Sequence, residues 1–365
     1  MSALQNLINL LIKIMERLSM KKIIIVFIGL CLVLFSRFGI SSNFTILGAG
    51  ATFPYPLYDK WFHVYENITG IKVNYQAIGS GGGIRQLINR IVDFGATDAF
   101  MSNDELHVAP AEILHFPTCI GAVVITYNLP RIPTLRFTPD ILADIFLGKI
   151  TKWNDKRIVE VNPNIKLPNM SIVVVHRADG SGTTFIFSDY LSKISEEWKK
   201  EVGVGKTLNW PVGLGGKGNP GVSGLVRQIP GSIGYVELIY AKQNKMPVGL
   251  IENKAGHFIK PTLKSISLAA NIRLPDDTRM SITDTNAPYG YPICSFSWII
   301  FYKEQFYGGR SLKKAKALAK LFWWMIHEGQ KYNERLLYAR LPHTVIKKAE
   351  LIIKNMTYKG KPIIK

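Results

Sequence analysis

The sequence predicts an α/β protein whose strands are mostly parallel. Three observations lead to this prediction. Short apolar runs alternate along the chain with segments whose apolar residues recur at helical spacing. Turns rich in Gly, Ser and Thr separate the two kinds of segment. A length of 365 residues also allows two domains, each with its own core.

Residues 44–96 are predicted to form two strand–helix units followed by a third strand. An apolar strand is expected at 44–47. The helix after it begins near Pro54 and ends at Gly70, because proline suits a first helical turn and glycine a helix end. The later elements here are a strand over 71–75, a helical face over 84–91 and a strand over 92–96.

The middle of the chain continues the alternation, and a long helix follows near the end. A helix is expected to begin at Thr138, which would cap it, and to end at Gly148. Pro139 suits its first turn, and the acid Asp140 suits the positive end of the helix dipole. The remaining predicted elements are buried strands over 122–127, 171–175 and 232–240, a helix from Phe185, and an amphipathic helix over 312–327 with Leu318, Leu321, Phe322 and Met325 on its apolar face.

One glycine-rich segment is interpreted as a loop. Residues 213–218 match the spacing GxGxxG, but no clear strand precedes them and Pro220 follows closely. Lys217 is followed by Gly218 rather than Ser or Thr, so the segment is not a Walker A sequence.

The charge of the chain points to an anionic partner. Lys and Arg number 45 against 26 Asp and Glu, a formal net charge of +19. Nucleic acid, an anionic lipid surface and a small anionic solute all fit this balance. The basic residues are dispersed rather than arranged in a stripe, which argues against nucleic acid. Three cysteines and seven histidines without metal-binding spacing indicate no metal site.

Residues 1–39 are expected to be an N-terminal extension and a cleavable signal peptide. Met20, Lys21 and Lys22 form a basic start, an apolar run over 23–35 follows, and small residues come after it. An uncleaved anchor remains the alternative, because Arg37 lies close to the expected cleavage position.

Three turns between a strand and a helix could bind an anion. They cover 50–53, 79–83 and 179–184. Ligands of open α/β sheets bind where strands end, and helix N-termini there offer free N–H groups. Arg177 would add a two-pronged donor. Each turn alone could be only a capped loop, but three turns and an arginine together favour an oxyanion site.

Seven segments resemble one protein family. They cover residues 48–54, 75–83, 93–99, 147–153, 177–183, 213–219 and 231–237. In order and in content they resemble the periplasmic phosphate-binding protein of the bacterial high-affinity phosphate ABC transporter. The resemblance spans nearly the whole chain after residue 39 and is weakest over 251–287.

The resemblance implies a two-lobed periplasmic binding protein of the type II kind, with two crossover hinge segments and a ligand cleft between the lobes. The first lobe would combine 40–117 with 289–365, and the second would cover 118–288. It further implies a periplasmic monomer without a cofactor. This receptor, not an enzyme, would pass inorganic phosphate to the permease and ATPase subunits of the transporter.

The resemblance also assigns the ligand contacts. By motif position, phosphate would be bound by Thr52, Phe53, Ser80, Asp98, Arg177, Ser181, Gly182 and Thr183, with Asp179 pairing the arginine. Gly81 and Thr97 stand where serines are common in the family. Asp98 has a chemical purpose, because phosphate near neutral pH carries a proton that a carboxylate can accept, whereas sulfate carries none.

Two alternative functions stay open: binding of another tetrahedral oxyanion, and a secreted phosphatase. A phosphatase needs a nucleophile beside a base. The sequence places no histidine next to Ser181 or Thr52, and His176 is the nearest candidate.

The resemblance places Cys119 and Cys294 just beyond the two crossovers. A disulfide across the hinge would suit an oxidising compartment, and two separate buried thiols are the alternative.

Overall fold

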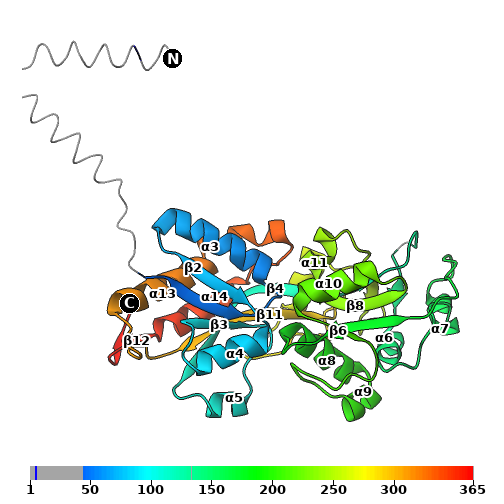
Figure 1. Ribbon diagram of the computed structural model, residues 1–365, viewed down its shortest axis with the longest axis horizontal. Coiled ribbons are helices and arrows are strands. Elements are labelled where there is room, and N and C mark those ends of the chain that lie inside the picture. The colour runs from blue at the N-terminus through cyan, green and yellow to red at the C-terminus, as the bar shows by residue number, and fades with distance from the viewer. Residues whose placement is uncertain (1–4, 6–43, 133, 365) are drawn as a thin grey trace, which may run out of the picture.

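One eight-stranded sheet runs through both lobes of the molecule (Figure 1). The computed structural model describes Gln5 and residues 44–132 and 134–364. Apart from Gln5, the extension and signal peptide predicted over 1–39 lie outside the described residues. The strand order is β2 (Val73–Ala77), β1 (Ile46–Gly50), β3 (Phe94–Thr97), β11 (Cys294–Tyr302), β4 (Ile113–Tyr127), β8 (Ser232–Glu237), β6 (Val173–Arg177) and β7 (Leu214–Gly216).

Each lobe has parallel outer strands, and the two lobes are joined by long antiparallel ones. In the first lobe β1 lies parallel to β2 and β3, and in the second β6 lies parallel to β7 and β8. Strand β4 pairs antiparallel with β11 through Ala122 and with β8 from Val123 onward. Because one continuous strand belongs to both lobes, their parallel strand ends are brought towards the same central region (Figure 1).

Helices pack against both lobes. The chain before β4 and after β11 supplies α3 (Tyr55–Thr69), α4 (Ser80–Ile88), α5 (Asn103–His107), α13 (Leu312–Ile326), α14 (His343–Lys354), and the 3₁₀ turns Glu328–Tyr332 and Glu334–Leu336. The chain between those strands supplies α6 (Pro139–Phe146), α7 (Lys156–Val161), α8 (Gly182–Ile194), α9 (Glu196–Glu201), α10 (Gly218–Gln228), α11 (Leu238–Gln243) and α12 (Leu263–Ala269). Short strands complete the fold: β5 (Arg136–Phe137), β9 (Leu250–Glu252), β10 (Phe258–Ile259), β12 (Thr357–Tyr358) and β13 (Lys361–Pro362).

The strongly periodic helices form where the sequence predicts them. Helix α3 has proline in its first turn and ends at Gly70, whose φ of 70° is left-handed. Its apolar face is buried, and the Trp61 indole donates to the Gly329 carbonyl at 2.7 Å. In α13 the predicted apolar face of Leu318, Leu321, Phe322 and Met325 is completely buried.

Several predicted elements differ from the structure. The strand predicted over 122–127 begins much earlier, at Ile113, as β4. The segment interpreted as a loop is a short strand, β7, followed directly by α10, so that interpretation is wrong. Helix α4 begins at Ser80, within the glycine turn. The strand predicted over 232–240 ends at Glu237, where α11 takes over. Strand β7 has only three residues and is a strand because it pairs with β6. A strand this short shows no periodic pattern in the sequence from which it could be predicted.

The two cysteines do not form the disulfide considered above. Both are free and buried. Cys119 lies opposite Ser297, and Cys294 lies opposite Ala122. The cysteines are therefore offset by three positions along the paired strands, about 10 Å at the usual rise per residue, and a disulfide requires closer Cα atoms. The alternative of two separate buried thiols is correct.

The segment before β11 contacts both lobes. Arg279 donates to the Met101 carbonyl at 3.1 Å, and Lys193 from α8 donates to the Thr283 hydroxyl at 2.7 Å. The boundaries between the two lobes, predicted at 117/118 and 288/289, stay a prediction. No helix of the described residues is both long enough and apolar enough to span a bilayer.

We expect Gly83→Ala to lower the free energy of unfolding. A Cβ at Gly83 would lie 2.5 Å from the Gly50 Cα and 2.6 Å from the Ala49 carbonyl oxygen, so α4 and β1 would have to separate. Overpacking of this kind costs about 1–3 kcal/mol, measurable by urea denaturation. The matched control is Gly224→Ala in α10, where a Cβ meets nothing within 4 Å. This substitution should raise the free energy of unfolding by up to about 1 kcal/mol, because alanine favours a helix more than glycine does. Equal effects at both positions would contradict the close packing of α4 on β1.

Candidate functional site

The three predicted turns meet where the lobes face each other. The turn after β2 touches the turn after β6, because the Gly81 N–H donates to the Gly180 carbonyl at 2.9 Å. Gly79, at φ 87°, lies so close that a Cβ there would be 2.4 Å from an Asp179 oxygen. The third turn, after β1, is linked to the second lobe through Thr52.

Arg177 is held rigidly by Asp179. Its Nε and Nη2 donate to the two carboxylate oxygens at 2.7 and 2.6 Å, and the arginine side chain is 1% exposed. Burial would raise the pKa of Asp179, but the hydrogen bonds and charge of Arg177 outweigh it and hold that pKa below its ordinary value. The Gly218 N–H also donates to this carboxylate at 2.9 Å. The guanidinium is therefore fixed in orientation.

Asp98 lies at the end of β3, buried among hydroxyl groups. Its two oxygens accept from the Ser297 hydroxyl at 2.6 Å and the Ser80 hydroxyl at 3.3 Å. Burial raises the pKa of Asp98 to about 7, although these bonds and the charge of Arg177 act in the opposite direction. Near neutral pH the carboxyl is therefore divided between its protonated and ionised forms.

The N-terminus of α8 approaches Asp98 closely. A Cβ at Gly182 would lie 2.6 Å from an Asp98 oxygen and 2.5 Å from the Ser80 oxygen, so glycine is required there. Ser181 caps the helix by accepting from the Thr184 N–H at 3.0 Å. The first N–H groups of α8 lack acceptors within the helix and are available to an anion.

The remaining predicted residues belong to the same network. Thr52 and Thr183 are buried, and their hydroxyls both accept from the side-chain amide of Asn219, at 2.9 and 3.1 Å. Phe53 follows Thr52, its ring packs against Gly121, and its carbonyl accepts from the Tyr338 hydroxyl at 2.6 Å. The structure thus brings every predicted site residue into one region, whereas their binding of phosphate stays a prediction.

Three residues that hydrogen-bond to the predicted site residues or their neighbours were not predicted from the sequence. Asn219 was hidden by interpreting 213–218 as a loop, although it ends one of the segments that carry the family resemblance. Ser297 lies on β11, a strand that the local sequence pattern does not predict. Tyr235 bonds the Thr184 hydroxyl at 2.6 Å and accepts from the Arg177 N–H at 3.2 Å. Only the pairing of distant strands brings these side chains to the site.

His176, the base considered above for a phosphatase, packs against another side chain. His176 precedes Arg177 on β6 and stacks on Trp210, with ring centroids 4.7 Å apart. Burial lowers the pKa of this histidine. Among the described residues, no hydrogen bond joins His176 to Ser181 or Thr52. Over the same ranges, no group of three or more His, Cys, Asp or Glu side chains is placed to hold a metal ion.

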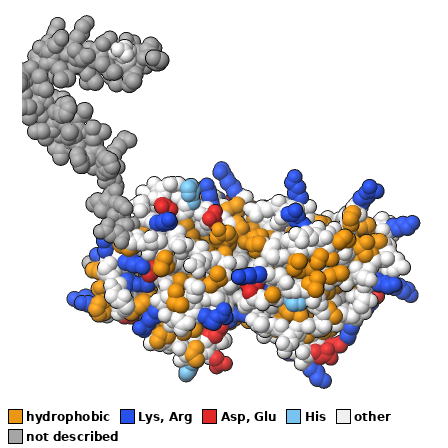
Figure 2. Space-filling view, viewed as in Figure 1, with side chains coloured by type: hydrophobic (Ala, Val, Ile, Leu, Met, Phe, Trp, Pro, Cys, Tyr) orange, Lys and Arg blue, Asp and Glu red, His pale blue; other side chains and the backbone are white. Residues whose placement is uncertain are grey.

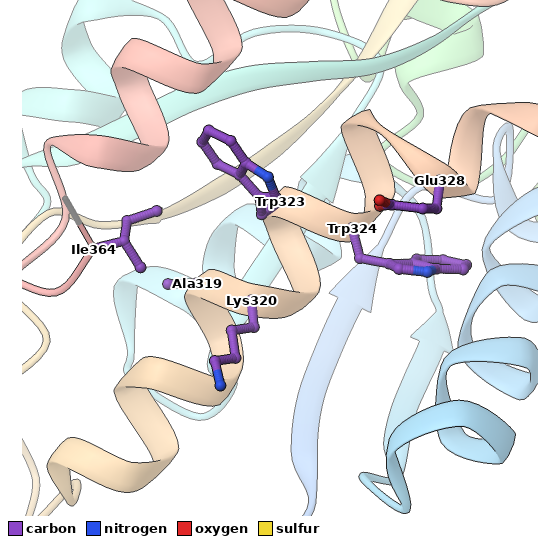
Figure 3. Close-up of a pocket in the computed structure, with 6 residues that line it drawn as sticks. All are labelled: Ala319, Lys320, Trp323, Trp324, Glu328 and Ile364. Atoms are coloured by element: carbon purple, nitrogen blue, oxygen red, sulfur yellow. The ribbon is translucent and has the colours of Figure 1, made fainter.

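The molecular surface carries no stripe of basic side chains on the face in view. Figure 2 shows Lys and Arg scattered around the outline of both lobes. A groove of about 260 Å³ beside α13 is lined by Ala319, Lys320, Trp323, Trp324, Glu328 and Ile364 (Figure 3). None of the predicted site residues lines this groove.

Comparison with known proteins gives concordant matches. A family model described as a PBP superfamily domain matches residues 41–328. The chain is 45% identical over 324 residues to the phosphate-binding protein PstS of Pasteurella multocida, covering 87% of this chain and 92% of that protein. It is 38% identical over 374 residues to the PstS protein of Methanocaldococcus jannaschii, covering 90% and 94% respectively.

Solved structures share the fold. A high-affinity periplasmic phosphate-binding protein, PfluDING, bound with phosphate, matches with a TM-score of 0.69 and 19% identity over 85% of this chain and 94% of that chain. An ABC-type phosphate transport receptor from Vibrio cholerae matches with a TM-score of 0.53 and 18% identity, covering 81% and 100%. These likenesses confirm the two-lobed α/β architecture.

We expect Asp98→Asn to stabilise the unliganded protein, and to do so more at pH 8 than at pH 5. The folded pKa of Asp98, about 7, exceeds the ordinary 3.8, so the folded state binds more protons and loses stability as pH rises between these values. Asparagine does not titrate. One pKa unit corresponds to about 1.4 kcal/mol. The difference in free energy of unfolding between the variant and the wild type should therefore be larger at pH 8 than at pH 5 by at least about 1 kcal/mol. Thermal unfolding at both pH values measures it, and a difference independent of pH would contradict it.

Proposed function

Because the chain belongs to the family of PstS phosphate-binding proteins, we propose that it captures inorganic phosphate and delivers it to an ABC transporter. The observation that supports this most directly is Asp98, a buried carboxyl whose two oxygens accept from the hydroxyls of Ser297 and Ser80. Arg177, the threonine hydroxyls and the N-terminus of α8 would supply positive charge and hydrogen bonds to an oxyanion.

Phosphate suits this combination better than a fully ionised anion does. A phosphate oxygen that keeps a proton donates to the Asp98 carboxylate, while the remaining oxygens accept from the surrounding donors. Sulfate has no proton to offer at neutral pH and would face the carboxylate as a like charge. Sulfate can bind only when Asp98 itself is protonated, so we propose that Asp98 sets the selectivity.

This mechanism makes sulfate binding dependent on pH. We expect the affinity of the wild type for sulfate to fall by about tenfold per pH unit above pH 7, as Asp98 ionises. Phosphate affinity should change much less, because phosphate brings its own proton. In Asp98→Asn the preference for phosphate over sulfate should shrink by at least about tenfold and lose its pH dependence. Titration calorimetry with both anions from pH 6 to 8.5 measures this, and unchanged discrimination in the variant would refute the role of Asp98.

The family is one of transport receptors, and we propose that this chain has no catalytic activity. The stacking of His176 on Trp210 supports this, since no hydrogen bond joins that histidine to Ser181 or Thr52 among the described residues. Turnover of a chromogenic phosphate monoester by the purified protein would refute it.

We propose that the protein works in the periplasm as a monomer after removal of a signal peptide within residues 1–39. Its partners would be the permease and ATPase subunits of the transporter, with contact to the membrane only through them. We propose no nucleic-acid partner, because the basic residues are dispersed along the sequence rather than arranged in a stripe. N-terminal sequencing of the secreted protein locates the cleavage site.

Closure of the two lobes would be stabilised by an ion pair between them. The Lys206 ammonium, in the second lobe, donates to both carboxylate oxygens of Glu105 on α5 at 2.8 and 2.7 Å. Both side chains are partly buried, so the pair is better protected from solvent than a surface ion pair.

We expect Lys206→Ala to weaken phosphate binding by up to about fivefold, chiefly through faster dissociation, because such a pair contributes up to about 1 kcal/mol. Stopped-flow measurement of the dissociation rate checks this. The matched control is Lys303→Ala, which removes an ion pair to Glu112 at 2.9 Å inside the first lobe. Equal changes in the two variants would show that the Lys206 pair has no special part in closure.

A further inference from the structure

Asn219 joins the two lobes through a single side-chain amide. It is fully buried in the first turn of α10. Its Nδ2 donates to the Thr52 hydroxyl in the first lobe and to the Thr183 hydroxyl in the second. Both threonines are among the predicted phosphate ligands. One donor group therefore touches ligand residues on both sides of the proposed binding site.

The bonds received by the two hydroxyls determine where their protons point. A hydroxyl oxygen has two lone pairs and one proton. The Thr52 oxygen accepts from the Asn219 backbone N–H at 3.2 Å and from Nδ2 at 2.9 Å. The Thr183 oxygen accepts from Asn219 Nδ2 at 3.1 Å and from Arg177 Nη1 at 3.2 Å. Both oxygens therefore have their acceptor positions filled, and each proton is left to donate to another partner.

The orientation of the amide is determined by its other end. Asn219 Oδ1 accepts from the Glu237 N–H at 2.9 Å. That backbone group can only donate, so the oxygen must face it, and Nδ2 must face the threonines. Strand β8 thereby fixes Asn219 as a donor to the site.

We propose that Asn219 is a positioning residue that converts the Thr52 and Thr183 hydroxyls into donors for the bound anion. This inference rests on the proposed phosphate-binding function. Because its two bonds reach residues of different lobes, the full arrangement forms only when the lobes are together. Asn219 thereby couples closure to the creation of two anion donors.

The inference is tested by removing the amide donor. Asn219→Asp keeps an oxygen for the Glu237 N–H but replaces Nδ2 with an acceptor, so both hydroxyl protons would turn away from the anion. Asn219→Ala removes the donor without adding charge. We expect phosphate affinity, measured by titration calorimetry, to fall by at least about tenfold in Asn219→Ala and by at least about a hundredfold in Asn219→Asp.

The matched control is Asn253→Asp. Asn253 is also a buried amide, with Nδ2 donating to the Pro288 carbonyl at 2.9 Å and Oδ1 accepting from the Ala255 N–H at 3.1 Å. It has no bond to a predicted site residue among those described. We expect it to lower the melting temperature and leave phosphate affinity unchanged.

A double-mutant cycle separates positioning from a merely structural role. In a Thr183→Val background, one of the two hydroxyls through which Asn219 acts is gone, so the loss caused by Asn219→Ala should shrink by at least about threefold. A loss of the same size in both backgrounds would overturn the inference. If Asn219→Asp does not fold, Asn219→Ala and this cycle decide the question.

The outcomes also distinguish this inference from the proposed function. If the wild type fails to bind phosphate, the proposed function is wrong. If the wild type binds phosphate and Asn219→Ala binds it within about threefold, the function stands and only the role of Asn219 is refuted.

Discussion

The burial of one carboxyl group, Asp98, is the constraint around which the site is organised. Removing a carboxylate from water is unfavourable, and the raised pKa of Asp98 reflects that penalty. Ser297 and Ser80 donate to its two oxygens, and Arg177 supplies a positive charge nearby. The close approach of Gly182 completes the enclosure. In the proposed function, an anion that brings its own proton would replace the missing solvation, whereas one without a proton would not.

The fold meets this constraint by bringing together residues that are far apart in the chain. Asp98 and Ser80 belong to the first lobe, Gly182 to the second, and Ser297 to β11, which pairs with the shared strand β4. Close contact needs small residues where the turns meet, and Gly79 and Gly81 lie directly against Asp179 and Gly180. A side chain at Gly79 would hold the turns apart, and with them the donors of both lobes.

Local patterns predicted much of this arrangement. Helices α3 and α13 formed as their apolar spacing and end residues indicated, because burial of one face dominates long helices. The three turns were recognisable because glycine, serine and threonine after a strand mark a backbone that ends in free N–H groups. The strand β7 was missed, since its identity comes from pairing with β6. The start of α10, and with it Asn219, was therefore missed as well. The register of β4 and β11 also kept Cys119 and Cys294 apart.

The sequence by itself determined the inventory of groups: the arginine, its paired aspartate, the hydroxyls and the glycine turns, each placed at the end of a strand or shortly after it. Those features depend on residue type and short spacing, which are local. Only the tertiary structure decided how the groups behave. The pKa of Asp98 depends on burial by both lobes, and the direction of the Thr52 and Thr183 protons depends on an asparagine reaching both. Desolvation and hydrogen-bond direction arise from neighbours distant in the chain, which no local pattern specifies.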